Sequence, residues 1–282
     1  MPRYALELEF NGADFSGSQS QTNARTVQDV VQSALAALAG ERVGFRPASR
    51  LDQGVSAAAL PGDCLLARDW DPEVLGLALN HQLPEDVVVR RAARVPDAFD
   101  ARRNAAAKHY RYRVLVRPVR PTLDRACLWV RRLQDPARLH ELAALIPGRH
   151  DLSGFACLRH DDTDQQDPHR DYLAALWSDR ILDDAIEWSL RISGRGFLYK
   201  QIRGLVGAMV HVAHGRARPD DFRAAMAAGW SARRLGNIAP AEGLLLAGVD
   251  YEPCPDWRAI GMESGSGSPE VRKSGSRDRE ST

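Results

Sequence analysis

The chain has 282 residues, of which 44% are hydrophobic and 27% charged, and its formal net charge is +1. This is the composition of an ordinary globular protein, and no apolar run reaches the roughly 18 residues of a membrane span, so we expect no membrane segment. The cysteines are scattered without a close pair, which argues against a disulfide framework or a zinc site and favours a reducing, cytoplasmic setting. They are Cys64, Cys127, Cys157 and Cys254.

The nearly neutral net charge hides a local excess of positive charge. Between Arg90 and Arg125 there are eleven Lys or Arg residues and three acids, a difference of eight. Such a stretch could line a surface that follows a phosphate backbone. It could equally be a solvated arginine-rich face, and the composition alone leaves both interpretations open.

Strand and helix patterns alternate through the first 105 residues. Tyr4 to Phe10 alternates in the manner of a strand. Apolar residues at helical spacing follow, with Thr26 and Asp29 as an N-terminal capping pair and Gly40 as a terminator. The expected order is a strand at 4–10, a helix at 27–38, strands at 42–48 and 64–67, a helix at 72–80 and a strand at 87–95.

The alternation continues from residue 106 to 257. Lys108, Tyr110 and Tyr112 share one face of an expected strand. The expected order is a strand at 108–116, a helix at 136–146, strands at 170–177 and 185–192, helices at 197–212 and 219–228, and a strand at 244–251. From about 258 the chain is rich in Gly, Ser and charged residues, which predicts a disordered tail at 258–282.

Two halves of similar pattern, 1–105 and 106–257, predict an α+β fold with two mixed sheets and a cleft where they meet. The pattern is compatible with an internal duplication without establishing one. The sequence contains no Walker-type loop, dinucleotide glycine fingerprint, zincin motif or nucleophile-elbow serine. We therefore expect no small-molecule cofactor.

The segment from Arg50 to Val55 joins two expected strands and holds a cation and an anion two residues apart. Gly54, two residues after Asp52, permits a tight turn. An exposed Asp52 in such a turn could reach a substrate, with Arg50 helping to keep it ionised. Turn aspartates more often accept backbone hydrogen bonds, and the local pattern alone favours that structural interpretation.

The sequence around this turn resembles a known family. Residues 49–57 read S-R-L-D-Q-G-V-S-A, where the tRNA pseudouridine synthase A family has G-R-T-D-x-G-V-H-A around its catalytic residue. Other segments resemble the family in the same order across residues 4–251. They are E-F-N-G-A-D-F-S-G-S-Q-S-Q, L-N-H-Q-L-P-E-D-V-V-V, A-F-D-A-R with K-H-Y-R-Y-R-V, H-D-L-S, P-H-R, F-L-Y-K-Q-I-R-G-L-V-G and A-P-A-E-G-L-L-L. The resemblance implies the pseudouridine synthase fold, with mixed antiparallel sheets, helices on one side and a central basic cleft.

The resemblance implies catalytic roles for four residues. Asp52 matches the carboxylate that attacks the target uridine and stays engaged while the detached base turns and rejoins through carbon. Arg50 matches the arginine that helps to displace the base from its stack. Tyr110 matches the tyrosine that packs on the uracil and assists proton removal at C5, and Arg203 matches the arginine paired with the carboxylate. From the pattern alone, Tyr110 could be a core aromatic and Arg203 a helix-surface cation.

Four further residues are candidates for substrate binding. Leu244 matches the leucine that lines the family's pocket, and Arg170 lies in a matching P-x-R segment. Lys108 and Lys200 flank the implied site and are candidate phosphate contacts. The acidic loop at 160–169 offers metal-like ligands in no recognised spacing, so we expect no metal.

The resemblance further implies that the substrate is transfer RNA, modified at positions 38–40 of the anticodon arm by a cytoplasmic homodimer. Several residues depart from the family pattern, and the loss of a Thr hydroxyl and a His side chain predicts weaker polar support around the turn. The departures are Ser18, Ser49, Leu51, Ser56, Asp100, Arg103 and Gly204. Two alternatives stay open: a divergent paralogue acting on another RNA, and an RNA-binding protein with little catalysis.

Overall fold

A computed structural model describes residues 1–158 and 167–261. The elements of the first half are β1 (Arg3–Phe10), α1 (Val27–Ala39), β2 (Phe45–Pro47), β3 (Ser56–Leu65), α2 (Pro72–Asn80) and β4 (Val87–Val95). Those that follow are β5 (Ala105–Val116), β6 (Leu128–Val130), α3 (Ala137–Ala143), β7 (Gly148–Asp151), β8 (His169–Ile181), β9 (Ile186–Gly194), α4 (Gln201–Ala213), α5 (Pro219–Ala228), β10 (Leu244–Tyr251) and β11 (Arg258–Ala259).

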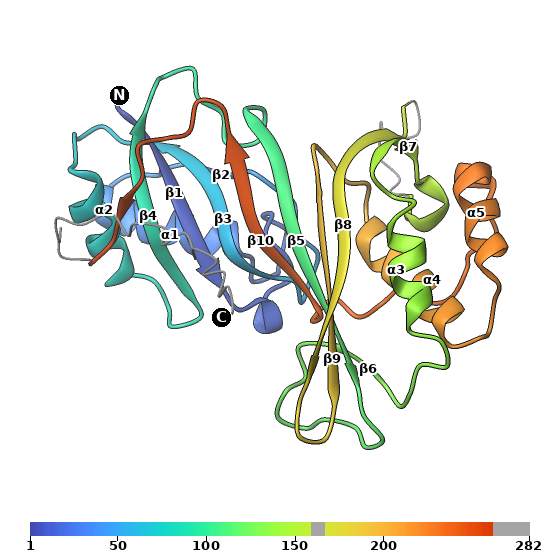
Figure 1. Cartoon of the computed structure of the whole chain (residues 1–282). Helices are drawn as coiled ribbons and strands as arrows, with labels where there is room; N and C mark the ends of the chain where they lie inside the picture. The colour runs from blue at the N-terminus through green and yellow to red at the C-terminus, as the bar shows by residue number, and fades with distance from the viewer. Residues whose placement is uncertain (159–166, 262–282) are drawn as a thin grey trace, which may run out of the picture.

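The strands of the described residues form one eleven-stranded sheet. Its main path is β11-β4-β1-β3-β10-β5-β9-β8-β7, with β2 paired to β3 and β6 paired to β5. Helices α1 and α2 lie beside the strands at one end of this sheet, and α3, α4 and α5 lie beside those at the other end (Figure 1). The predicted α+β class is confirmed.

The single sheet corrects the expectation of two separate ones. Strand β10 joins the halves, because it runs parallel to β3, with Leu246 opposite Ala57, and antiparallel to β5, with Leu246 opposite Tyr110. One hydrophobic cluster accordingly contains buried residues of both halves. Pairing between strands so far apart in the chain leaves no mark on local periodicity, which is why the sequence did not predict it. The proposed boundaries, 1–105 and 106–257, stay a prediction.

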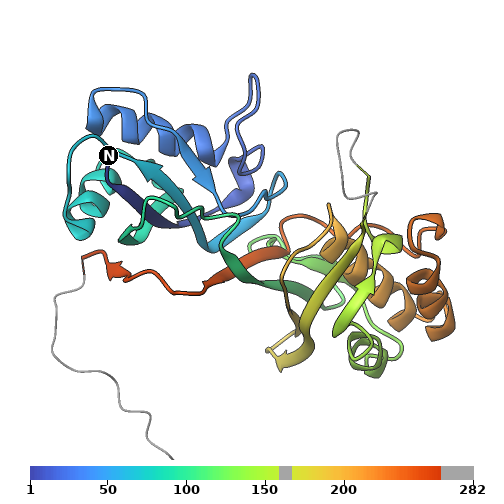
Figure 2. The same ribbon diagram turned by 90° about the horizontal axis from the view of Figure 1, so that it is seen from above.

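The chain returns to the first half after β10 (Figure 2). Strand β11 pairs with β4, and Trp257 packs with Ala5 and Ala93. Ile260 occupies the space beside Gly76 of α2 that a larger residue there would fill. The tail predicted at 258–282 therefore starts too early, since its first residues form a strand. Residues 262–282 lie outside the described residues.

The capping signals predicted for α1 are confirmed. The Thr26 hydroxyl accepts a hydrogen bond from the Asp29 backbone N–H, and Gly40 ends α1 in the left-handed conformation. The strands predicted at 87–95 and 244–251 are confirmed. The helix predicted from residue 197 begins instead at Gln201, because Lys200 has a φ of 58°, outside the helical region.

Candidate functional site

The loop between β2 and β3 carries Asp52 on a tight turn. The Val55 N–H donates to the Asp52 carbonyl at 3.1 Å, and Gly54 has a φ of 82°. Glycine adopts this left-handed conformation without the penalty that a side chain would bring. The sequence therefore places Asp52 at the tip of a turn that few residues other than glycine could complete.

Serines supply the polar support of this turn. The Ser18 hydroxyl, fully buried, donates to the Ser49 carbonyl at 3.0 Å and accepts from the Leu51 N–H at 2.8 Å. The Ser56 hydroxyl accepts from the Gly12 N–H at 2.9 Å. The weaker polar support expected from the departures is thus offset by the same substituted positions, Ser18 and Ser56.

Asp52 forms an ion pair with Arg203, which comes from the first turn of α4. Their Oδ2 and Nη1 atoms are 2.8 Å apart, and the two side chains are 15% and 14% exposed. Arg203 is itself fixed, because its Nε donates to the Ala239 carbonyl at 2.8 Å. A charge-assisted hydrogen bond in this partly desolvated position holds the carboxylate in one orientation.

Tyr110 and Lys108, both from one face of β5, meet Ser49 beside the turn. The Ser49 hydroxyl lies 3.1 Å from Tyr110 Oη and 3.3 Å from Lys108 Nζ, and Lys108 also donates to the Ala48 carbonyl at 3.0 Å. Burial, followed by the charge of Asp52, raises the pKa of Tyr110 to about 12. Burial also lowers the pKa of Lys108 to about 8. Tyr110 is therefore a neutral phenol near pH 7, and Lys108 directs hydrogen bonds at the loop.

One pocket brings together seven of the eight residues singled out by the sequence. Its lining is Ser49, Arg50, Leu51, Asp52, Val55, Arg102, Lys108, Tyr110, Phe197, Leu198, Tyr199, Lys200, Gln201, Ile202, Arg203 and Leu244. Arg170 is the exception: it lies at the start of β8, and its Nη1 donates to the carbonyls of Asp167 and His169. Its predicted contact with substrate therefore has the least geometric support.

Individual lining residues differ in how they present charge and apolar surface. Arg50 is exposed and has no hydrogen bond or ion pair within the described part of the chain. The Lys200 ammonium lies 4.9 Å from the centroid of the Tyr199 ring, and Leu244 is 7% exposed. The pocket thus combines one paired carboxylate, an apolar wall and several cations, which suits a flat heterocycle carrying phosphate.

Sequence reasoning missed several lining residues. Phe197 packs edge-on to Tyr110 with ring centroids 5.3 Å apart. Arg102 lies in the A-F-D-A-R run that resembles the family, so a signal was present although no role was attached to it. Ser49 was noted only as a departure from the family motif, because its contacts are with β5, about sixty residues further along the chain.

No group of three or more potential metal ligands occurs in residues 1–158 and 167–261. Most of the acidic loop at 160–169 lies outside the described residues. Among the helices that the structure describes, none is both long and apolar enough to cross a membrane.

Comparison with known proteins matches nearly the whole chain to one family. A tRNA pseudouridine synthase A of Beijerinckia indica is 43% identical over 253 residues, which cover 89% of this chain and 94% of that protein. The corresponding proteins of Methylocella silvestris and of a Methylobacterium species are 37% and 40% identical, over 89% and 90% of this chain and 99% and 100% of theirs. The chain belongs to the tRNA pseudouridine synthase A family.

Other comparisons differ in weight. A family model described as tRNA pseudouridine synthase matches residues 142–252 of this chain, a region that includes α4 and β10. A solved structure of a Cbf5–Nop10–Gar1 complex aligns with 10% identity and a TM-score of 0.30, over 74% of this chain and 54% of that one, a likeness too weak to carry an argument. The resemblance inferred from the collinear motifs is confirmed by the relatives.

Proposed function

We propose that this chain isomerises uridine to pseudouridine in transfer RNA, with the Asp52 carboxylate as the nucleophile. The observation that carries the proposal is the ion pair between Asp52 and Arg203 in the pocket of a tRNA pseudouridine synthase A family member. An ionised carboxylate at the tip of a rigid turn, partly removed from water, is the group that nucleophilic attack on a nucleoside requires.

The reaction is an internal rearrangement. The bond between N1 of the uracil and the ribose breaks, the base turns, and a bond forms between C5 and the ribose. The C5 proton is lost and N1 gains one, so atoms balance without an oxidant, a reductant or a second substrate. Asp52 stays engaged throughout, and Arg203 at 2.8 Å stabilises its anionic form whenever the carboxylate is free.

Tyr110 forms the apolar wall against which the base packs. Because its pKa is raised to about 12, it acts as a neutral hydrogen-bonding phenol, and a phenolate base is disfavoured near pH 7. Proton transfer from C5 to Tyr110 Oη would require the phenol proton to pass to Ser49, 3.1 Å away, while the Ser49 hydroxyl gives its own proton to the neutral amine of Lys108, 3.3 Å away. Leu244 and Phe197 complete the wall on the neighbouring elements.

Arg50 is placed to act before the chemistry. It is exposed at the pocket beside Asp52 and has no partner among the described residues. A target base must leave its stack to reach a pocket of this kind, and a guanidinium can stack in the vacated space or pair with phosphate. We assign Arg50 to that step.

Finer features of the proposal rest on the family. They are modification at positions 38–40 of the anticodon arm, a homodimer and a cytoplasmic location. The local excess of positive charge between Arg90 and Arg125 supports an RNA substrate, because Arg102 and Lys108 from this stretch line the pocket.

The test is turnover of unmodified tRNA transcripts by the wild type and Asp52→Asn. We expect the wild type to form pseudouridine, mapped by position, and Asp52→Asn to lose all detectable turnover while keeping tRNA affinity within about threefold, since the amide is isosteric but not nucleophilic. Melting temperatures of both proteins serve as the folding control. Pseudouridine formed by Asp52→Asn would contradict the assignment. Absence of product from wild type on any tRNA would favour the non-catalytic RNA-binding alternative, and product only on another RNA the divergent paralogue.

A further inference from the structure

Arg102 lies in the pocket without a counter-ion. It is exposed, and its side chain has no hydrogen bond or ion pair within the residues that the structure describes. Arg50 and Lys108 line the same pocket, and the charge of Arg102 is one cause of the lowered pKa of Lys108. The pocket's carboxylate, Asp52, is already paired with Arg203. Cations gathered in this way repel one another unless an anion arrives.

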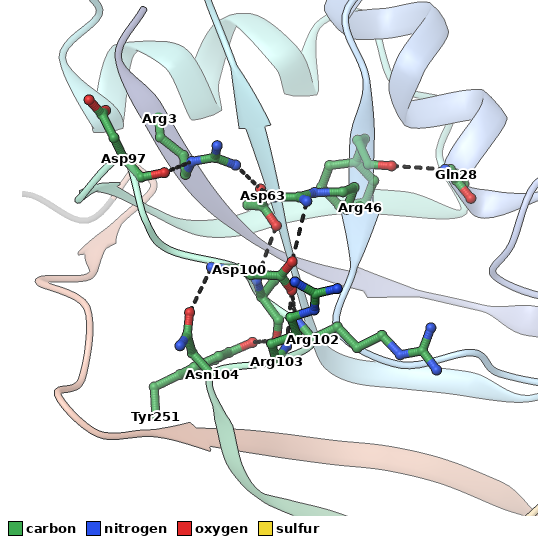
Figure 3. A network of polar contacts seen from close by, with 12 residues as sticks. Arg3, Gln28, Arg46, Asp63, Asp97, Asp100, Arg102, Arg103, Asn104 and Tyr251 are labelled. Atoms are coloured by element: carbon green, nitrogen blue, oxygen red, sulfur yellow. Dashed lines mark hydrogen bonds and ion pairs between the residues drawn. The ribbon is translucent and has the colours of Figure 1, made fainter. Parts of the chain in front are cut away.

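The turn that carries Arg102 is fixed on both sides of its preceding residue. The Ala101 N–H donates to Asp63 Oδ1 at 3.0 Å, and the Ala101 carbonyl accepts from Tyr251 Oη at 2.7 Å. Ala101 itself is fully buried. Asp63 comes from β3 and Tyr251 from β10, so two central strands hold this turn (Figure 3).

A second set of contacts links the turn to the same buried carboxylate. Asp100 Oδ1 accepts the backbone N–H groups of Arg102 at 3.0 Å and Arg103 at 2.9 Å. Arg46 lies between the two acids, with Nη1 3.2 Å from Asp100 Oδ2 and Nη2 2.7 Å from Asp63 Oδ2 (Figure 3). Asp63 is 1% exposed. We call Asp63, Arg46 and Asp100 the acid–arginine bridge.

The bridge satisfies backbone groups and leaves the Arg102 guanidinium outside it. The hydrogen bonds to the buried Asp63 and to Asp100 hold this segment in one conformation. The entropy of ordering it is therefore not lost again when a ligand binds. The Asp100 carboxylate accepts the backbone N–H groups of Arg102 and Arg103 and forms an ion pair with Arg46. It forms no ion pair with the Arg102 guanidinium. Rigid backbone combined with an unpaired guanidinium is the arrangement of a preorganised anion contact.

We propose that Arg102 contacts a phosphate group of the RNA and that the acid–arginine bridge is a positioning device for it. The proposal rests on the proposed function for the nature of the ligand. Arg102 is then a substrate-binding residue, and Asp100 and Arg46 act through it. Asp100, a departure from the family pattern, therefore has a function specific to this chain.

The first experiment measures affinity for unmodified tRNA against salt concentration. Arg102→Ala should weaken binding about five- to tenfold near 0.1 M salt and reduce the slope of log K against log salt by about 0.7 to 0.9, the value for one phosphate contact. Arg103→Ala is the matched control, because it removes the same charge from the same turn at a position that does not line the pocket. An unchanged slope for Arg102→Ala, or an equal change for Arg103→Ala, overturns the contact.

The second experiment separates positioning from general stability. Asp100→Ala should weaken binding about threefold, and the double variant Asp100→Ala with Arg102→Ala should bind no more weakly than Arg102→Ala alone. Asp100→Asn should recover part of the loss, because its amide oxygen can still cap Arg102 and Arg103. If the double variant loses as much binding free energy as the two single variants together, Asp100 does not act through Arg102, and the positioning role is overturned.

Turnover by the wild type keeps this inference separate from the proposed function. If the wild type binds tRNA but forms no pseudouridine, the proposed function fails, while the salt slopes still decide the Arg102 contact. If the wild type forms pseudouridine and the slopes do not differ, the Arg102 inference alone fails.

Discussion

Ser49 stands where the tRNA pseudouridine synthase A family has glycine, and its hydroxyl lies between Tyr110 and Lys108. Tyr110 is buried, and a buried hydroxyl without a hydrogen-bond partner costs roughly 1–3 kcal/mol. The serine therefore gives the Tyr110 hydroxyl a partner and the Lys108 ammonium a second one besides the Ala48 carbonyl. The replacement of glycine by serine at this position therefore adds hydrogen bonds to the pocket wall.

Lys108 provides a pH-dependent prediction. Its pKa is lowered from 10.5 to about 8 because the ammonium is buried, so between these values the unfolded chain binds more protons than the folded one. Unfolding free energy should therefore rise as the pH rises from about 8 to 10.5, by up to about 3 kcal/mol. Below pH 8 the buried ammonium carries the full penalty.

Lys108→Met is the comparison that isolates this effect, since it has similar length and no charge. Urea unfolding of both proteins at several pH values between 7 and 10.5 cancels other titrations. We expect the wild type to gain stability relative to Lys108→Met across that interval. A difference that stays constant with pH would show that the ammonium is not desolvated.

At the scale of elements, α4 depends on two close approaches. A Cβ on Gly204 would lie 1.8 Å from the Phe155 carbonyl oxygen, and one on Gly207 would lie 1.8 Å from that of Asn237. The segment that follows Asn237 holds Arg203 through Ala239. Glycine at these positions therefore lets α4 deliver Arg203 to Asp52.

Gly204→Ala tests that dependence. Alanine is the better helix former by about 1 kcal/mol, but the steric overlap requires the backbone to move, and overpacking of this kind costs about 1–3 kcal/mol. We expect a net loss of unfolding free energy in urea and a fall in turnover. Gly248→Ala is the matched control, because a Cβ there meets nothing within 4 Å. Equal stability of the two variants would mean that the contact yields without cost.

The elements differ in how far the sequence could predict them. Strand β10 and helix α1 were predicted closely because alternation, caps and terminators are local. Lys200 ends the loop before α4 in a left-handed conformation, which no local residue preference predicts for lysine, so the helix start was wrong. The short strand β11 was missed because its stability comes from β4 and from Ile260 packing beside Gly76.

The site follows the same division. The turn was predictable from Gly54 in the local sequence, yet nothing local indicated that Asp52 is more than a turn residue. Its partner Arg203 is 151 residues away, and only the family resemblance connected them. Arg102 was overlooked because its proposed role depends on the cations that line the same pocket and on Asp63, which holds its turn from another strand. Contacts across the sheet decide these roles, and periodicity does not encode them.

At the scale of the whole molecule, β10 joins the two halves into one sheet, because it pairs with β3 of the first half and β5 of the second. Leu246 in this strand is fully buried, opposite both Ala57 and Tyr110. The ion pair of Asp52 and Arg203 crosses the same junction, and one hydrophobic cluster extends through both halves. Unfolding of either half would expose the other half's core and break the pocket.

We therefore expect a single cooperative unfolding transition. Tryptophan fluorescence sums six residues, including Trp70 in the first half and Trp177 and Trp188 in the second. It should follow the same urea curve as far-ultraviolet circular dichroism. Leu246→Ala should cost about 2–5 kcal/mol and shift both curves together, because it removes a contact shared by the halves. Two separated transitions, or a Leu246→Ala shift in one signal alone, would mean that the halves unfold independently and that the junction at β10 contributes little to holding the pocket.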